Sequence, residues 1–516
     1  MKRKQWKRFL TCAGAAALLT CGGCSRTAGI SPSDTKPEES QTEASVSGTE
    51  AETGTNIDES AGETVGETVF SPTVPESSSG EQILEKPNGE SDDGGQEEEV
   101  SYQIIENIIL ATDIHYFDPS LTDYGTRFQE MVEYGDGKVV TYIDEITDAF
   151  LEEVIQLRPN ALILSGDLTL EGEKKSHESL AEKLYRVEEA GIPVLVIPGN
   201  HDINNKRAAR YEGEQRLPAE YTTPEEFRRI YRDFGYDEAI SEDVRSLSYV
   251  YQLDEEHRIM MLDTCQYRPV AKVGGAILSE TYYWIEEQLE EAWDEAMDVI
   301  PVAHHNLLEE SKIYVDDCTI EHGEQLVDIL DEWDVKLFLS GHLHVQRIRK
   351  HKAEPGAADD SYGIMEIVTD ALSIPPCQYA LLEWKRDGSM EYSTKAVDVS
   401  AWAARTGSQN PDLLDFEGWS ELYIQKLIID QIRGVVKNLG NDVEHSMAEV
   451  YASVYIDYYA GRRIDAKGIR SSKGYRWWER NMPDSYLLKE LDAMIDDSDR
   501  DNNYMLLPEV NAAAEE

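Results

Sequence analysis

The stretch NIILATDIH, Asn107–His115, opens the part of the chain that decides the fold. Its first six residues, Asn107–Thr112, predict a buried strand, and Asp113 and His115 follow directly. Alternate side chains at a strand's end can face one site if the chain turns there. The stretch therefore predicts a sheet whose edge carries metal-ligating groups.

Four later segments repeat this arrangement of an apolar run followed by polar groups. They are Ala161–Ser165 with Gly166 and Asp167, Pro193–Ile197 with Asn200, His201 and Asp202, Val299–Ala303 with His304 and His305, and Val335–Ser340 with His342 and His344. Each places potential ligands at the carboxyl end of a strand, where α/β proteins collect their active sites.

These residue types fit one particular chemistry. A hydrolase that directs water at phosphorus can use two metal ions roughly 3.5–4 Å apart. Two cations that close repel each other, so a carboxylate should bridge them while neutral imidazoles complete the site. The sequence predicts such a two-metal site, assembled from five loops.

The ordered motifs DxH, GD, GNHD, HH and GHLH resemble the calcineurin-like metallophosphoesterase superfamily, from Asn107 to about Trp384. The resemblance implies an α/β fold, the metallophosphoesterase four-layer α/β/β/α sandwich, here with a C-terminal helical domain. It assigns one metal to Asp113, His115, Asp167 and His344, and the other to Asp167, Asn200, His304 and His342. A hydroxide bridging the metals would be the nucleophile, His201 would protonate the leaving group, and Asp202 would orient the His201 ring.

Alternatives exist for single residues. Asp113, Asp167 or Asn200 alone would more often cap a turn or a helix, and a lone His304 would be a core residue. A catalytically inactive family member is the stronger alternative, although no expected ligand is missing. His305 is open between a role in the substrate pocket and simple packing.

Differences between these motifs and those of other branches of the superfamily indicate which branch the sequence resembles most. Gly166–Gly172 reads GDLTLEG, unlike the Ser/Thr protein phosphatases, and no tyrosine follows Asp167 until Tyr185, unlike the purple acid phosphatases. The motifs are most similar to the cyclic-nucleotide phosphodiesterase-like branch. The expected cofactors are two divalent metal ions, manganese, iron, zinc or a mixture.

The chain begins as an exported protein would. A basic head precedes the short apolar run Leu10–Thr20, so residues 1–24 are expected to be a signal peptide. The end of this segment resembles a lipobox, with Gly23 before Cys24, and predicts a lipid on Cys24 that anchors the protein outside the cytoplasm on the bacterial cell membrane. Plain secretion is the alternative.

Residues 25–100 are rich in Ser, Thr, Gly, Pro and Glu, with 19 acidic and 3 basic residues. Such a segment cannot bury enough apolar surface to order itself, and a disordered acidic tether is expected. The whole chain carries a formal charge of −53, which would repel a nucleic acid polymer. A small phosphate ester remains the expected substrate, and the oligomeric state is open.

Residues 101–400 should form the catalytic domain, because strands there alternate with helices such as 142–156, 178–190 and 280–296. The second sheet is expected to be completed by strands at 248–253, 259–262, 364–368 and 379–384. The inserts 116–140 and 203–245 follow metal motifs and should wall the substrate pocket. Within them Tyr116, Tyr124 and Arg127 could contact substrate, though surface packing is favoured.

Residues 401–516 should form a helical domain, since 420–439 and 447–459 carry apolar residues at helical spacing. It could act as a lid, a dimer surface or a stabilising cap. The basic and aromatic run from Arg462 to Trp478 favours a helical hairpin with tryptophan in the core over a phosphate or glycan site. Asp497, Asp499 and Asp501 begin like a calcium loop, but Asn502 and Pro508 break that pattern.

Three cysteines follow the signal segment, Cys265, Cys318 and Cys377, enough for one disulfide or for three thiols. The leading prediction is an exported dinuclear metal-dependent phosphoesterase that hydrolyses phosphodiesters or phosphomonoesters. The alternatives are a surface lipoprotein that binds a phosphorylated ligand or protein partner without turnover, and an envelope phosphoprotein phosphatase.

Overall fold

The computed structural model describes residues 104–269, 271–309, 311–313, 317–351 and 363–507. The signal peptide, Cys24 and the acidic tether lie outside these residues. Among the described residues, no helix combines the length and the apolar character that crossing a membrane requires. Cys265 and Cys377 form no disulfide.

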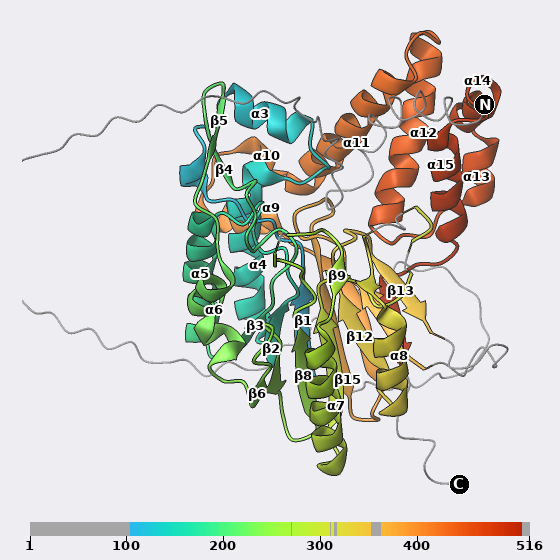
Figure 1. Ribbon diagram of the computed structural model, residues 1–516. Helices are drawn as coiled ribbons and strands as arrows, with labels where there is room; N and C mark the ends of the chain where they lie inside the picture. Colours follow the sequence, from blue (N-terminus) through green and yellow to red (C-terminus); the bar gives the residue numbers. More distant parts are fainter. Residues whose placement is uncertain (1–103, 270, 310, 314–316, 352–362, 508–516) are drawn as a thin grey trace, which may run out of the picture. The chain divides into compact units, whose positions relative to one another are not determined.

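Two sheets form the centre of the described chain (Figure 1). The first has the order β17 (Tyr504–Leu507), β16 (Met390–Ala396), β15 (Gln378–Lys385), β1 (Ile104–Ala111), β2 (Ala161–Leu164) and β3 (Val194–Val196). The second has the order β13 (Arg347–Lys350), β14 (Met365–Val368), β12 (Leu337–Ser340), β10 (Asp298–Ala303), β8 (His257–Leu262), β7 (Tyr249–Gln252) and β6 (Ser241–Glu242). Two small pairs are β4 (Ala209–Glu212) with β5 (Gln215–Pro218), and β9 (Gly275–Ala276) with β11 (Ile320–Glu321).

Alternating side chains show how the layers pack. On β8, Ile259 and Met261 belong to the large core that also contains β1 and β2, whereas Met260 and Leu262 face a separate cluster. That second cluster includes α7 (Ser279–Asp294) and α8 (Gly323–Glu332). Since side chains alternate between the faces of a strand, the two sheets pack face to face and these helices cover the outer face of the second.

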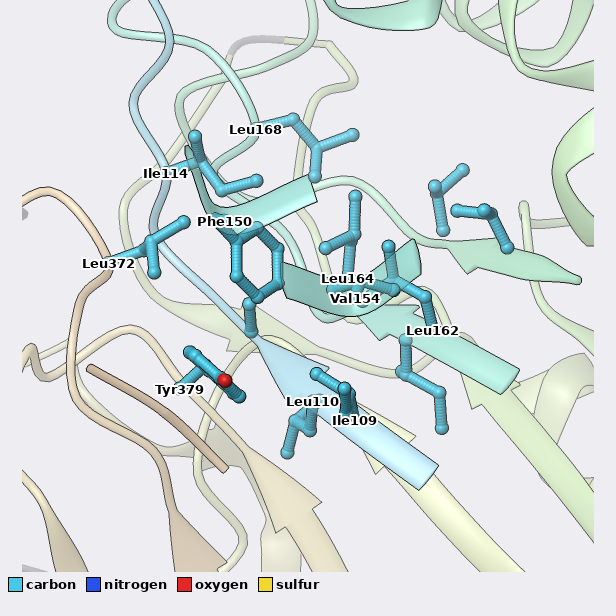
Figure 2. Packing of buried hydrophobic residues seen from close by; sticks show 14 of the residues in the cluster. Ile109, Leu110, Ile114, Phe150, Val154, Leu162, Leu164, Leu168, Leu372 and Tyr379 are labelled. Atoms are coloured by element: carbon cyan, nitrogen blue, oxygen red, sulfur yellow. The ribbon is translucent and has the colours of Figure 1, made fainter. Parts of the chain in front are cut away.

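The outer face of the first sheet is covered by α4 (Ile143–Leu157) and α5 (Lys174–Glu189). Figure 2 shows Phe150 of α4 beside Tyr379 of β15, with ring centroids 5.1 Å apart. Ile114 and Leu168, from the first two ligand loops, join the same buried cluster. The predicted four-layer α/β/β/α sandwich is therefore confirmed, and the core extends directly beneath the ligand loops.

The parallel pairing of strands in both sheets determines where the predicted ligands lie. β1, β2 and β3 are parallel neighbours, and β8, β10, β12 and β14 are parallel neighbours in the other sheet. Their carboxyl ends consequently lie along one edge. One expected strand was placed wrongly: 379–384, as β15, pairs antiparallel with β1 and belongs to the first sheet. Hydrophobic pattern alone does not specify a strand's partner, because both sheets bury both faces.

The remaining helices complete the described chain. In the inserts lie α3 (Thr126–Glu133) and α6 (Pro224–Ile230), with short turns at Pro119–Leu121, Val140–Tyr142 and Arg232–Tyr236. The C-terminal helices are α9 (Val399–Thr406), α10 (Pro411–Leu414), α11 (Phe416–Val435), α12 (Asn441–Tyr459), α13 (Ala466–Ser471), α14 (Lys473–Asn481) and α15 (Tyr486–Asp497). The predicted C-terminal helical region is confirmed, and the chain then returns as β17 to pair with β16.

The tryptophan of the basic run is a core residue, as predicted. Trp478 is fully buried in the helical cluster, and its indole N–H donates to the Met447 carbonyl at 2.9 Å. Asp497 does not begin a calcium loop: its carboxylate lies 2.7 Å from the Arg349 guanidinium and 3.4 Å from that of Arg347. This aspartate instead neutralises two arginines of β13.

Candidate metal centre

Four of the predicted ligands meet in one group at the shared edge of the sheets. Donor atoms of Asp113, His115, Asp167 and His344 all lie within 4.8 Å of one another, and all four residues are buried. The two Nε2 atoms of His115 and His344 are 3.1 Å apart, and His344 Nε2 is 3.1 Å from Asp113 Oδ1. The group joins loops separated by more than two hundred residues.

The backbone of these loops is strained in a consistent way. Asp113, His115, Asp167, His342 and His344 all have positive φ, between 47° and 70°. Residues other than glycine rarely adopt this conformation, which costs of order 1–3 kcal/mol and persists where the surroundings enforce it. In the DxH motif it turns both Asp113 and His115 toward the site while Ile114, between them, enters the core.

A second group forms around His304. Its Nε2 lies 3.2 Å from Asn200 Oδ1, 3.2 Å from His342 Nδ1 and 3.5 Å from Asp167 Oδ2. The same Asp167 Oδ2 is 3.7 Å from His115 Nε2 in the first group. One carboxylate oxygen therefore stands between both groups, in the position expected of a bridging ligand.

Electrostatics keep the two acids ionised. Burial opposes the charged form of Asp167, but His201 and His304 outweigh it and hold its pKa well below the usual value. Burial likewise opposes ionisation of Asp113, and His344 lowers its pKa overall. Both aspartates thus present carboxylates, the form that binds cations.

Three motif glycines allow the loops to approach this closely. A Cβ on Gly166 would lie 2.7 Å from His304 Nδ1, one on Gly199 would lie 2.8 Å from Asp167 Cα, and one on Gly341 would lie 2.8 Å from Asp113 Oδ2. Each distance is shorter than real Cβ contacts. The glycines of GD, GNHD and GHLH are therefore required by the packing of ligand loops against each other.

His201 lies beside the bridging aspartate. Its backbone N–H donates to Asp167 Oδ1 at 2.8 Å, and its Nε2 is 3.8 Å from Asp167 Oδ2. Nε2 is buried without a hydrogen-bond partner among the described residues. Burial opposes protonation, but Asp167 and Glu171 raise the pKa of His201 to about 9. The ring can therefore hold a proton at neutral pH, at an atom that no described protein group uses.

The expected role of Asp202 is wrong. Its carboxylate accepts from the backbone N–H groups of Leu168 (3.0 Å), Thr169 (2.9 Å) and Gly199 (2.8 Å), and so ties the GD loop to the GNHD loop. The His201 ring is held elsewhere: Nδ1 donates to the Leu170 carbonyl at 2.7 Å and lies 3.5 Å from Glu171 Oε2.

Glu171 is the carboxylate that sequence analysis missed at this position. It also accepts from the Arg207 guanidinium at 2.8 Å, and its pKa is lowered to about 2 because His201 and Arg207 outweigh its burial. The sequence contained a usable indication, since Glu171 follows Asp167 by four residues within GDLTLEG.

His305 has a structural role. Its ligand atoms cluster with those of His304 and His342. However, its Nε2 is 2.8 Å from the Val273 carbonyl and its Nδ1 is 2.8 Å from Thr264 Oγ1. A neutral imidazole has one donor and one acceptor nitrogen, and both are used here. Of the two roles left open for His305, these contacts support packing beside the site rather than a role in the substrate pocket.

The residues present fit two divalent cations. Carboxylate oxygens, an amide oxygen and imidazole nitrogens converge as lone-pair donors, and in each group two imidazole nitrogens approach within 3.2 Å of each other. Buried nitrogens at such distances can satisfy both lone pairs by sharing a cation. The mixed oxygen and nitrogen set suits manganese, iron or zinc.

Residues of the first insert have partners outside the two ligand groups. Tyr116 is buried with its hydroxyl donating to Asp144, and the exposed Arg127 pairs with Glu130 on α3, so surface and core packing account for both. Lys138 is buried as well, and its ammonium pairs with Asp136.

Comparison with known proteins agrees with this geometry. Residues 107–346 match the model of calcineurin-like phosphoesterases, and residues 398–501 match the model of the C-terminal domain of cyclic nucleotide phosphodiesterase. A probable cyclic nucleotide phosphodiesterase from Synechococcus sp. is 26% identical over 190 residues, covering 37% of this chain and 59% of the relative. Another from Psychrobacter arcticus is 25% identical over 251 residues, covering 48% of this chain and 76% of the relative. The chain thus spans little more than half the length of the first of these relatives.

Among solved structures, a dimetal phosphatase from Danio rerio is similar with a TM-score of 0.41 and 12% identity, covering 57% of this chain and 97% of that one. A purple acid phosphatase from yellow lupin is similar with a TM-score of 0.37 and 14% identity, covering 57% and 51%. Residues 107–346 thus match the calcineurin-like phosphoesterase model, and within them Asp113, His115, Asp167 and His344 converge as a group that could hold a metal ion.

Proposed function

We propose that this protein is an exported dinuclear metal-dependent phosphoesterase that hydrolyses phosphodiester or phosphomonoester bonds. One observation carries the proposal: Asp167 Oδ2 lies 3.7 Å from His115 Nε2 and 3.5 Å from His304 Nε2, with the unpartnered Nε2 of His201 3.8 Å away. Two cation positions, a shared carboxylate and a proton donor thereby occupy one buried site.

The predicted ligands form two sets, one for each metal ion. Asp113, His115 and His344 would hold one metal and Asn200, His304 and His342 the other, with Asp167 on both. When bound, the two ions supply an activated water and neutralise the charge that develops on the phosphoryl oxygens.

His201 supplies the proton. Because Nδ1 donates to the Leu170 carbonyl, the acidic proton of the imidazolium is the one on Nε2. The P–O bond to the leaving group breaks as this proton passes to the departing oxygen, and the ring becomes neutral. Glu171 and Asp167 favour the protonated ring beforehand.

A small phosphate ester fits the charge of the chain. The formal charge of −53 disfavours a polyanion at the surface, whereas a small ester meets mainly the local field of the metal site. The names of the relatives support cyclic nucleotides as substrates to test. The N-terminal sequence supports lipidation at Cys24, which a Cys24→Ser variant would test through loss of fatty-acid labelling.

The test joins metal analysis to a substrate panel. Purified protein should contain two metal ions per chain and hydrolyse aryl phosphodiesters or monoesters, assayed beside cyclic nucleotides and phosphopeptides. Asp167→Ala and His201→Ala should abolish turnover, and His201→Ala should keep its metals because its side chain is in neither ligand group. A protein that binds two metals yet hydrolyses nothing over a manganese, iron and zinc panel would instead be a binding lipoprotein, and phosphopeptide preference would identify a phosphoprotein phosphatase.

A further inference from the structure

The GHLH loop, Gly341–His344, supplies a ligand to each predicted metal position. His344 Nε2 lies 3.1 Å from Asp113 Oδ1 in the first group, and His342 Nδ1 lies 3.2 Å from His304 Nε2 in the second. Both loop histidines have positive φ, 70° for His342 and 56° for His344. Residues other than glycine keep this conformation only where the surroundings enforce it, so the loop depends on what packs against it.

The residues that alternate with these histidines are buried in the C-terminal helical domain. Leu343 and Val345 belong to the apolar cluster that α11, α12, α14 and α15 form, and Val345 is fully buried there. The apolar neighbours of the other predicted ligands lie instead in the clusters of the sandwich, namely Ile114, Leu168, Ile197, Ile203 and Leu307. Within the part of the chain that the structure describes, the GHLH loop is thus the one ligand loop anchored in the helical domain.

Polar contacts fix the residue after the loop to the same domain. The Gln346 N–H donates to the carbonyl of Tyr459, the last residue of α12, at 2.9 Å. The Gln346 side-chain amide donates to the Asn502 carbonyl at 2.9 Å, and the Asn502 N–H donates to the Gly461 carbonyl at 2.8 Å. These contacts act two residues away from His344, a predicted ligand.

Gly461 lies in close contact with Gln346. Its φ is +67°, and a Cβ there would lie 2.6 Å from Gln346 Cγ and 2.9 Å from the Gln346 carbonyl oxygen. Because one of these atoms is backbone, a larger residue at position 461 would displace the Gln346 main chain as well as its side chain. Only Val345 stands between Gln346 and His344 in the chain. The packing of the helical domain is therefore linked to the position of a predicted ligand.

We propose that the C-terminal helical domain positions the GHLH loop, and that it acts through Val345, Gln346 and Gly461 to strengthen the binding of both metal ions. These three are positioning residues, since none of them belongs to either ligand group. Because the domain holds the imidazoles of the loop in place before an ion arrives, binding orders less of the protein and is tighter. The inference rests on the two-metal site of the proposed function and extends it by giving this domain a role.

Replacing Gly461 with alanine tests the proposal with manganese alone. Titration of the metal-free full chain with Mn²⁺, against a competing chelator, should show binding weakened by about tenfold or more in Gly461→Ala, as when groups that orient metal ligands are lost. Gly407→Ala is the matched control. Gly407 follows α9 with φ +75°, and a Cβ there meets nothing within 4 Å. Both variants place alanine in left-handed backbone, but Gly461→Ala alone displaces Gln346.

Gly407→Ala should bind two manganese ions with wild-type affinity. Equal manganese affinities in the two glycine variants would overturn the proposal. A wild-type protein that binds two ions with an affinity that Gly461→Ala weakens, yet hydrolyses no ester, would support the proposal and overturn the proposed function alone.

A pair of valine variants separates positioning from stability. Val345→Ala and Val436→Ala each remove two methyl groups from the same buried cluster, and both should lower the midpoint of urea unfolding. Val436 follows α11, and α12, whose 19 residues span about 28 Å, separates it from Tyr459. Manganese binding should weaken by about tenfold in Val345→Ala and stay at the wild-type level in Val436→Ala. Weakening by the same factor in both would refute a specific effect on the loop.

Hydrogen exchange of the wild-type protein tests the same coupling without a variant. Coupling between two sites is reciprocal, so a domain that tightens metal binding must itself be stabilised by bound metal. Two bound manganese ions should slow amide exchange in α12 by about tenfold, and by less in α7, whose cluster contains no residue of the GHLH loop. Slowing in α12 that is no greater than in α7 would overturn the proposal.

Discussion

Replacing Gly199 with alanine tests whether close packing of the loops positions the bridging aspartate. A Cβ at this position would lie 2.8 Å from Asp167 Cα, with the Asp167 backbone nitrogen nearer still. Ordinary contacts begin at 3.4 Å, so the two loops would have to separate by at least about 0.6 Å. Two of the three nearest atoms are backbone atoms of Asp167 and the third is its carboxylate oxygen, so the clash falls on the bridging residue itself.

The expected cost has two parts. Overpacking of this kind destabilises a protein by about 1–3 kcal/mol. The displacement also moves Asp167 away from both ligand groups, and a misplacement of about 1 Å can cost roughly 100-fold in rate. We therefore expect Gly199→Ala to lower turnover by about two orders of magnitude and to bind fewer than two metals per chain.

The assay combines elemental analysis, aryl phosphodiester hydrolysis and urea unfolding on purified protein. Gly434→Ala is the matched control, because a Cβ there meets nothing within 4 Å and the residue lies inside α11. It should retain full activity and gain about 0.5–1 kcal/mol, since alanine favours a helix over glycine. A Gly199→Ala protein with two metals and turnover within twofold of the wild type would refute the reasoning.

Three further variants address charges elsewhere in the fold. Glu171→Gln should lower the pKa of His201, about 9 in the structure, so the alkaline fall in kcat should move to lower pH; an unchanged profile would exclude Glu171 as its partner. Glu490 is 2% exposed, and burial raises its pKa to about 8. Between about pH 4.5 and 8 the folded chain therefore holds a proton that the unfolded chain releases. The free energy of unfolding should fall as the pH rises through this range, by at most about 1.4 kcal/mol per pH unit. Glu490→Gln should remove this fall in urea unfolding measured across that range. Asp497→Ala should cost about 3–5 kcal/mol in the same assay, because it leaves the buried guanidinium of Arg347 without its carboxylate.

Much of the metal centre followed from local sequence. The apolar runs predicted that Asp113, Asp167 and Asn200 lie at the carboxyl ends of strands, which parallel pairing brings to one edge, and the family resemblance assigned them as ligands. Strand order and the turn in each motif bring these residues together in the structure.

Predictions that depended on side-chain partners were less successful. Asp202 is adjacent to His201 in sequence, yet its carboxylate binds backbone N–H groups of the preceding ligand loop. His305 is adjacent to His304 but points to Val273 and Thr264. His201 and Asp202 lie in a turn and His304 and His305 in a bend, where adjacent side chains have different partners, so adjacency in sequence does not predict contact in the site.

The sequence by itself indicated the class of fold and the charge of the chain, because apolar runs and charged residues are local properties, and the family resemblance of its motifs supplied the ligand set. Only the tertiary structure decided that β15 and β17 join the first sheet, that Glu171 lies against His201, and that α11 packs on the first insert at Lys138. These contacts join segments up to several hundred residues apart, and each depends on which surfaces remain uncovered once the two sheets have packed.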